Sequence, residues 1–147
     1  MLLGDDIMRS ETPVIGQLIQ AAEKYQCSAV GIQQVSTEAI SKYCSVKIGS
    51  AESDGIINID DVVEKPRREQ IFSNYAILGR YVLTPRIFGI LEKLSPGAGG
   101  EIQLTDGLRQ LCKRSRLVGV TSTASATTRA TSPAFWRPPS TSPWITP

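Results

Sequence analysis

Two hydrophobic periods alternate along residues 1–113, and this alternation restricts the fold more than any other feature of the sequence. Apolar residues recur at helical spacing in three segments, which predicts helices over 12–26, 85–94 and 104–114. Runs rich in β-branched residues predict strands over 28–35, 44–50, 55–66 and 74–84. Helices and strands in this order are typical of an α/β domain with a mixed sheet.

Capping residues predict where two of these helices begin. Thr12 is a suitable N-cap residue for the first helix, and Pro13 suits its first helical position. Thr105 is the expected cap of the last helix, in the stretch EIQLTD.

The pattern stops after about Lys113, so we expect residues 114–147 to form a disordered C-terminal tail. Residues 121–147 hold 12 Ser and Thr and five prolines, without periodicity. Such a segment buries too little apolar surface to offset its ordering entropy, roughly 1–2 kcal/mol per residue. A basic nucleic-acid-binding arm is the alternative, but four arginines in 114–147 are too few to favour it. We therefore expect no nucleic-acid partner.

Composition excludes two further classes. The chain has three cysteines and no histidine, which argues against a zinc site and suits reduced thiols in a cytoplasmic protein. No apolar run reaches the roughly 18 residues of a membrane span, and no signal peptide is evident. A cytoplasmic protein without a membrane partner is the expectation.

Asp5 is the candidate metal ligand. The stretch LLGDD places it just beyond an apolar segment, where open α/β sheets bind ligands. A carboxylate there suits Mg²⁺, which prefers oxygen ligands. The alternative is a plain Gly-Asp-Asp turn.

Glu64 and Lys65 are candidate substrate-binding residues at the end of the strand VVEKP. A carboxylate can accept hydrogen bonds from sugar hydroxyls, and a lysine suits a phosphate. Neighbouring strand residues face opposite ways, so two solvated charges are the alternative.

The glycine-rich stretch PGAGGEIQLTD supplies the last candidates, Gly99, Gly100 and Glu101. Glycines let a ligand approach the backbone closely. A hinge or a simple connection between two helices would also use them.

These stretches together resemble bacterial UTP–glucose-1-phosphate uridylyltransferases. The resemblance covers residues 1–112, corresponds to the C-terminal half of that family, and is strongest over 62–106, with VVEKP, GRYVLTP and PGAGGEIQLTD. It implies part of a mixed-sheet, Rossmann-like nucleotidyltransferase domain that joins UTP and glucose 1-phosphate into UDP-glucose and pyrophosphate. Members are often homo-oligomers, so the resemblance leaves a homo-oligomer open.

The resemblance also implies roles for the candidate residues. Asp5 would bind Mg²⁺, Glu64 would hold glucose hydroxyls, and Lys65 would contact the phosphate. The loop with Gly99, Gly100 and Glu101 would line the sugar side. No residue is assigned as a catalytic acid or base, because this reaction depends on positioning and charge.

Three departures from the family follow. The Gly-rich nucleotide loop is absent upstream, and a stretch like YDTGDK is absent downstream. Tyr43-Cys44 stands where members usually carry Tyr-Gly, so the Cys44 thiol is expected to crowd the sugar site. We expect no turnover by this chain alone. A non-catalytic sugar-phosphate-binding or oligomerisation fragment, and a product that does not fold, remain alternatives.

A change of reading frame explains the tail. Codons for residues 121–132, TSTASATTRATS, can be chosen so that a shift by two bases encodes Glu-Tyr-Gly-Lys-Arg-Tyr-Asp-Thr-Gly-Asp-Lys. That string is the missing downstream motif. The hypothesis is a frameshift near residues 114–120.

Overall fold

The computed structural model describes residues 1, 6–52, 55–97, 100–121 and 125–128. It contains short 3₁₀ turns, η1 (Ile40–Lys42) and η2 (Arg68–Gln70), besides its helices and strands. Most of the expected tail, residues 129–147, lies outside the described residues.

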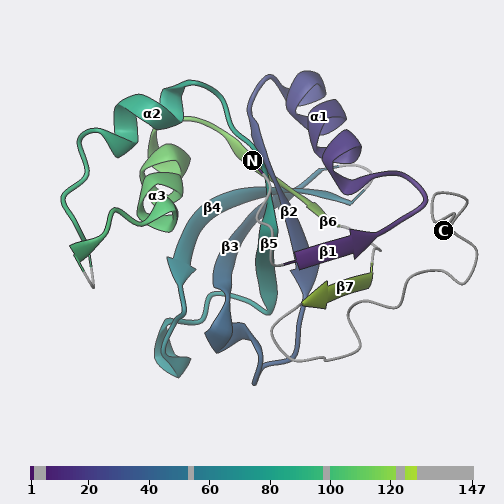
Figure 1. Cartoon of the computed structure of the whole chain (residues 1–147), viewed down its shortest axis with the longest axis horizontal. Helices are drawn as coiled ribbons and strands as arrows, with labels where there is room; N and C mark the ends of the chain where they lie inside the picture. The colour runs from purple at the N-terminus through teal and green to yellow at the C-terminus, as the bar shows by residue number, and fades with distance from the viewer. Residues whose placement is uncertain (2–5, 53–54, 98–99, 122–124, 129–147) are drawn as a thin grey trace, which may run out of the picture.

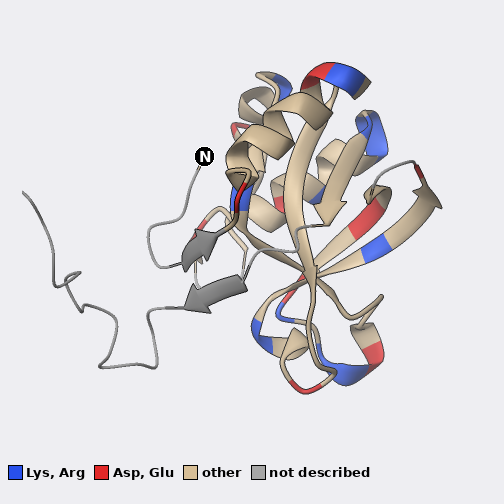
Figure 2. Ribbon diagram, turned by 90° about the vertical axis from the view of Figure 1, so that its right-hand side faces the viewer, with Lys and Arg blue, Asp and Glu red and all other residues tan. Residues whose placement is uncertain are grey.

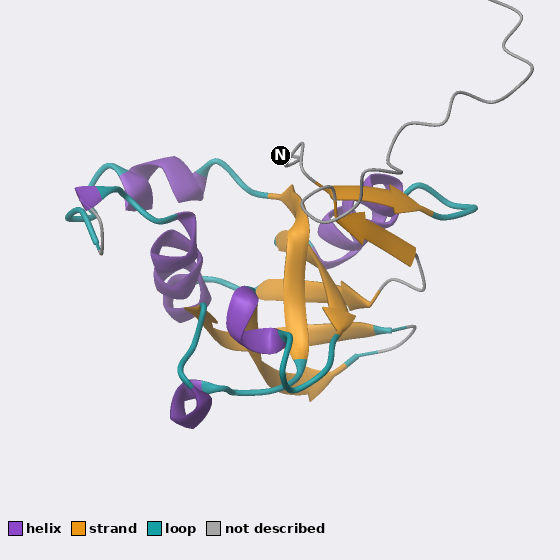
Figure 3. Cartoon of the chain, turned by 60° about the horizontal axis from the view of Figure 1, so that its bottom comes forward, coloured by secondary structure: helices purple, strands orange, loops and turns teal. Residues whose placement is uncertain are grey.

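Five strands form one mixed sheet whose pairings close on themselves (Figure 3). They are β2 (Ser28–Gln34), β3 (Cys44–Ala51), β4 (Ile56–Glu64), β5 (Tyr75–Val82) and β6 (Leu117–Thr121). Their order around the ring is β2-β5-β3-β4-β6. The β2–β6 pair is parallel and the others are antiparallel, so the expected mixed sheet is confirmed.

The closed ring differs from the open sheet of a Rossmann-like half. β4 pairs with β3 along most of its length and then with β6 through its first residues, Ile56–Asn58. The β3–β4 register shifts between Lys47 and Ile48 and again between Ile48 and Ala51. Such irregularities bend strands and increase their twist, which allows the ladder to curl round to β6.

The ring encloses an apolar core. The largest cluster of buried side chains comes from all five strands and includes Val30, Val46, Ile59, Val62, Ile77 and Leu117. Gly119 of β6 lies so close to Ile32 that an added Cβ would fall 2.6 Å from Ile32 Cδ1. The glycine therefore leaves room for the isoleucine in the core.

Helices flank the ring on two sides (Figure 1). α1 (Val14–Tyr25) buries Val14, Leu18 and Ala21 in a second cluster with β2 and β6. α2 (Arg86–Leu91) and α3 (Leu104–Arg114) pack together on the opposite side and contribute to the main core. The expected cap at Thr12 is wrong, because Pro13 holds the N-cap position and makes no side-chain cap bond.

β6 lies within the segment expected to be a tail. Leu117, Val118 and Val120 are buried, and β6 pairs in parallel with β2. The expectation of disorder from residue 114 is therefore wrong for residues 114–121. A short apolar strand surrounded by other strands has no alternation of apolar and polar residues, which hid β6 in the sequence.

A separate two-stranded ladder joins the two ends of the described chain. β1 (Asp6–Arg9) pairs antiparallel with β7 (Ser125–Thr128), and Asp6 lies opposite Thr128. Within the described residues, no helix has the length and apolar character needed to cross a bilayer.

Candidate functional site: a cleft between β4 and α3

The end of β4 and the beginning of α3 enclose a cleft of about 510 Å³. Its lining residues are Val62, Val63, Glu64, Lys65, Gln103, Thr105, Asp106 and Arg109. Glu64 and Lys65, the two residues predicted to hold a sugar phosphate, therefore share one cavity.

The backbone at Lys65 explains how adjacent residues face the same cleft. Lys65 has φ of +39°, a left-handed conformation that ends the extended geometry of β4. Its N–H donates to the Tyr43 carbonyl oxygen at 2.9 Å, which holds the turn against the start of β3. The strict alternation of strand side chains therefore stops at Glu64. A non-glycine residue in this region is uncommon and often marks a functional site.

α3 forms the other wall. Leu108 and Leu111 are buried and fix the helix against the sheet, as the spacing of its leucines predicts. The expected cap at Thr105 is wrong, because the N-cap residue is Gln103. Thr105 lies in the first turn instead, and its Oγ1 donates to Glu64 Oε2 at 2.6 Å. No local sequence pattern predicts this role.

Charges of both signs line the cleft, with Glu64 and Asp106 beside Lys65 and Arg109. Figure 2 shows that both signs are spread over the described ribbon. Arg109 is bound to Asp61 by two nitrogen–oxygen contacts of 3.0 and 3.3 Å. Lys65 is exposed, and its ammonium makes no ion pair with any residue in the described part of the chain. Lys65 is thus the cation of this cleft that is free to bind an anion.

Cys44 of β3 is paired with the cleft residue Glu64. It sits directly opposite Glu64 in the β3–β4 register and is buried. Burial, and then the negative charge of Glu64, raise the pKa of the Cys44 thiol to about 12, so it stays protonated at neutral pH. Cys44 is not among the residues that line the cleft, so in this structure the thiol does not crowd it as expected.

The glycine-rich stretch borders the cleft at Gly97, where an added Cβ would fall 3.3 Å from Oδ2 of the lining residue Asp106. Gly100 has φ of +78°, and its N–H donates to the Gly97 carbonyl oxygen. The Gly97 N–H in turn donates to the carbonyl oxygen of Glu101, which is exposed. Gly99 lies outside the described residues. Neither Gly100 nor Glu101 lines the cleft with Glu64 and Lys65.

The predicted metal ligand, Asp5, also lies outside the described residues. Within the part of the chain that the structure describes, no three His, Cys, Asp or Glu side chains gather as a metal site would require. Mg²⁺ usually takes only one or two protein carboxylates and completes its shell with water and substrate phosphates. One aspartate is therefore compatible with Mg²⁺.

A second cleft of about 510 Å³ lies between the C-terminal end of α3 and the first half of β4, and it contains none of the predicted residues. Arg116 is its cation, but the guanidinium already donates to Glu52 at 2.6 Å and to Asn58 at 2.7 Å. It also lies 4.7 Å from the Tyr25 ring centroid. These contacts leave little capacity for a ligand, so the β4–α3 cleft is the better candidate.

Relatives of known function resemble this chain closely. It is 44% identical over 114 residues to the UTP–glucose-1-phosphate uridylyltransferase YngB of Bacillus subtilis (strain 168). The match covers 78% of this chain and 38% of that protein. It is 44% identical over 100 residues to the UTP–glucose-1-phosphate uridylyltransferase of Pseudomonas aeruginosa, which covers 68% of this chain and 36% of the relative. The chain thus spans well under half the length of these relatives.

Solved structures agree with the sequence relatives. A UDP-glucose pyrophosphorylase complexed with UDP-glucose matches with a TM-score of 0.79 and 41% identity, over 85% of this chain and 48% of that one. A UTP-bound enzyme from Acinetobacter baumannii, at 24% identity and a TM-score of 0.74, matches in fold.

The chain is therefore homologous to UTP–glucose-1-phosphate uridylyltransferases. The sequence signature of nucleotidyl transferases extends over residues 1–136, which places the chain in the nucleotidyl transferase family.

Proposed function

We propose that the β4–α3 cleft binds glucose 1-phosphate for transfer of a uridylyl group. The observation that carries this proposal is that Glu64 and Lys65 line one cavity although they are neighbours at a strand end. A carboxylate beside an unpaired ammonium matches a ligand that has hydroxyls at one end and a phosphate at the other.

In the proposed complex the Glu64 carboxylate accepts hydrogen bonds from sugar hydroxyls. The Lys65 ammonium binds the phosphate and offsets its charge. These contacts orient a phosphate oxygen for in-line attack on the α-phosphorus of UTP, with pyrophosphate as the leaving group. Catalysis of this kind comes from positioning and electrostatics, so no residue of the cleft is proposed as a catalytic acid or base.

The nucleotide and metal sides of the reaction are also proposals. Asp5 would hold Mg²⁺, which when bound offsets negative charge on the phosphates. Glu101 and the loop glycines Gly99 and Gly100 would line the sugar side, next to the cleft residue Gln103 of the same stretch. The described cysteines are all free thiols, which supports the proposed cytoplasmic location.

Calorimetric titration of the full chain with glucose 1-phosphate tests this proposal. Lys65→Met should weaken binding about tenfold or more, because a charge-assisted contact to phosphate is lost. Glu64→Gln should weaken the binding of glucose 1-phosphate but leave the affinity for inorganic phosphate unchanged. Arg68→Met is the matched control, since Arg68 is an exposed cation outside the cleft.

Two outcomes would contradict the proposal. One is the absence of any heat with glucose 1-phosphate at millimolar concentration. The other is an equal loss of affinity in the Lys65 and Arg68 variants, which would indicate general attraction of anions by net charge.

A further inference from the structure

The hydrogen bond from Thr105 to Glu64 joins the two walls of the cleft. Thr105 Oγ1 lies 2.6 Å from Glu64 Oε2, across 41 residues of sequence. A hydroxyl–carboxylate bond of this length is charge-assisted and strong for its class. Within the described residues, the second oxygen of Glu64, Oε1, has no hydrogen-bond partner. One carboxylate oxygen is thus held by the protein, and the other is available.

Thr105 is well suited to hold a neighbour in place. It lies in the first turn of α3, whose buried Leu108 and Leu111 fix the helix against the sheet. A β-branched residue in a helix also has few χ1 rotamers, so its hydroxyl occupies few positions. Glu64, by contrast, is exposed at a strand end and has a long, flexible side chain.

Among the described side chains near Glu64, only Thr105 donates a hydrogen bond to its carboxylate. Cys44 lies opposite Glu64, but its thiol is a weak donor and faces the Ser45 carbonyl oxygen at 3.9 Å. The nearby cation Arg109 is already bound to Asp61. No other described side chain donates a hydrogen bond to Glu64.

We propose that Thr105 is a positioning residue that fixes the Glu64 carboxylate, so that Oε1 faces the sugar hydroxyls of the bound sugar phosphate. This inference rests on the proposed function for the identity of the ligand, but the positioning itself is independent of it. Thr105 also lines the cleft, but its hydroxyl proton is donated to Glu64 Oε2, and its effect on the sugar comes through that contact. It therefore tunes selectivity for the sugar and leaves affinity for the phosphate unchanged.

The test compares three variants of the full chain. Thr105→Val removes the hydroxyl at nearly constant volume, and Thr105→Ser retains it. Thr37→Val is the matched control, because Thr37 is an exposed threonine outside this cleft whose hydroxyl accepts a hydrogen bond from Asn74. Thermal unfolding of each variant verifies that it folds.

The first measurement needs no ligand. NMR scalar couplings of the Glu64 side chain should report one dominant rotamer in the original chain and in Thr105→Ser, and rotamer averaging in Thr105→Val. Unchanged couplings in Thr105→Val would overturn the positioning role, whatever the chain binds.

The second measurement is calorimetric titration with glucose 1-phosphate, galactose 1-phosphate and inorganic phosphate. Thr105→Val should bind glucose 1-phosphate about tenfold more weakly and discriminate less between the two sugars, with equal affinity for phosphate. Thr105→Ser and Thr37→Val should stay near the original affinities. In a Glu64→Ala background, Thr105→Val should have no further effect.

The outcomes separate the two proposals. Equal binding of glucose 1-phosphate by Thr105→Val and the original chain overturns the role in selectivity and leaves the proposed function standing. A parallel loss of phosphate affinity also overturns it, because the cleft itself would be distorted. If the original chain binds neither sugar phosphate, both the proposed function and the role in selectivity are overturned. The NMR couplings of Glu64 still test whether Thr105 positions its carboxylate.

Discussion

Arg109 on α3 forms a two-point ion pair with Asp61 on β4, with Nε 3.0 Å from Oδ1 and Nη2 3.3 Å from Oδ2. The pair lies beside the cleft and connects the same two elements that form its walls. Because the Arg109 side chain is 48% exposed, solvent screens much of the attraction.

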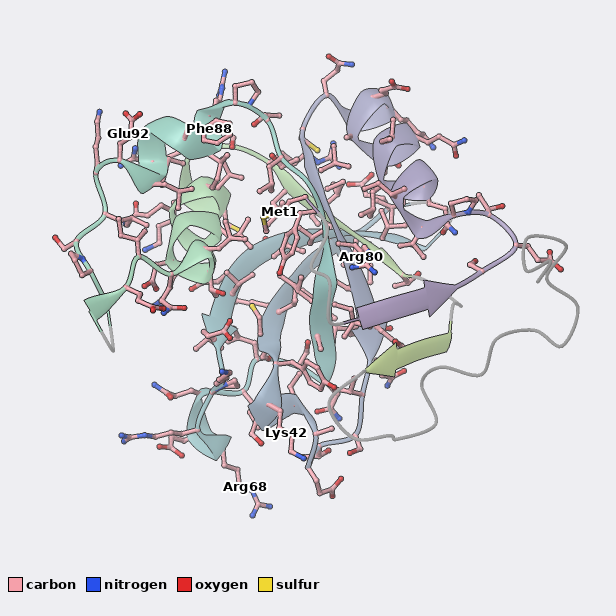
Figure 4. All side chains as sticks on the ribbon, in the orientation of Figure 1. Met1, Lys42, Arg68, Arg80, Phe88 and Glu92 are labelled. Carbon is pink, nitrogen blue, oxygen red and sulfur yellow. The ribbon has the colours of Figure 1, made fainter. Side chains whose placement is uncertain are left out.

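Arg109→Met should therefore lower the free energy of unfolding by less than about 1 kcal/mol. The loss should shrink as salt rises, since exposed ion pairs are screened. Urea denaturation at low and high sodium chloride measures both quantities. Arg68→Met is the control, because Arg68, which is labelled in Figure 4, is exposed. It should lower the free energy of unfolding little at either salt concentration. A loss independent of salt would assign the effect to packing of the arginine stem.

Two glycine-to-alanine changes should act in opposite directions. Gly119→Ala places a methyl group 2.6 Å from Ile32 Cδ1 and 3.2 Å from Ile59 Cδ1, so we expect a loss of about 1–3 kcal/mol from overpacking. Gly16→Ala, within α1, meets nothing within 4 Å and should stabilise by roughly 0.5–1 kcal/mol. Chemical denaturation of both variants checks the signs. A neutral Gly119→Ala would mean that β6 is loosely packed.

Two thiols should make the fold less stable at high pH. Burial raises the pKa of Cys44 and of Cys112 from the ordinary 9.0 to about 12. Above pH 9 the unfolded chain loses these protons while the folded chain keeps them. Their contribution is therefore complete below pH 9 and is lost as pH rises towards 12.

Unfolding by urea between pH 8 and pH 11 tests this dependence. The double variant Cys44→Ala/Cys112→Ala should show a shallower fall in stability over that range than the original chain. Val46→Ala, a buried change without a titrating group, should be less stable throughout but keep the original slope. Equal slopes in all three chains would contradict the predicted shift.

The frameshift hypothesis predicts a specific DNA sequence. The hypothesis places the change of frame near residues 114–120. Genomic codons for residues 121–132, shifted by two bases, should encode Glu-Tyr-Gly-Lys-Arg-Tyr-Asp-Thr-Gly-Asp-Lys. Sequencing the locus tests this prediction. Codons that do not encode this string in the shifted frame would contradict the hypothesis.

Local patterns predicted most of the secondary structure. The leucine spacing of α3 and the β-branched runs of β4 and β5 are signals carried by neighbouring residues, and the structure confirms all three elements. β6 was missed because its short apolar run has no alternation of apolar and polar residues and is followed at once by the Ser- and Thr-rich segment. A strand this short is recognised only by its partner β2.

The site was predictable only where a motif marked it. Glu64 and Lys65 follow from the VVEKP motif, and the structure places both in one cleft. Thr105 gave no such signal, because its partner lies 41 residues away and its local context predicts a helix cap. Contacts of this kind depend on how α3 packs against β4, which no local pattern specifies.

The parallel pairing of β2 with β6 has a consequence for the order of events during synthesis. β2 is made well before β6, so one of its two neighbouring strands emerges only when residue 121 has been translated. Before β6 emerges, the edge of β2 that pairs with β6 has unpaired backbone N–H and C=O groups. These groups can pair with other chains. A nascent chain halted before Leu117 should therefore stay sensitive to protease and bind chaperones, and release of the last strand should end both.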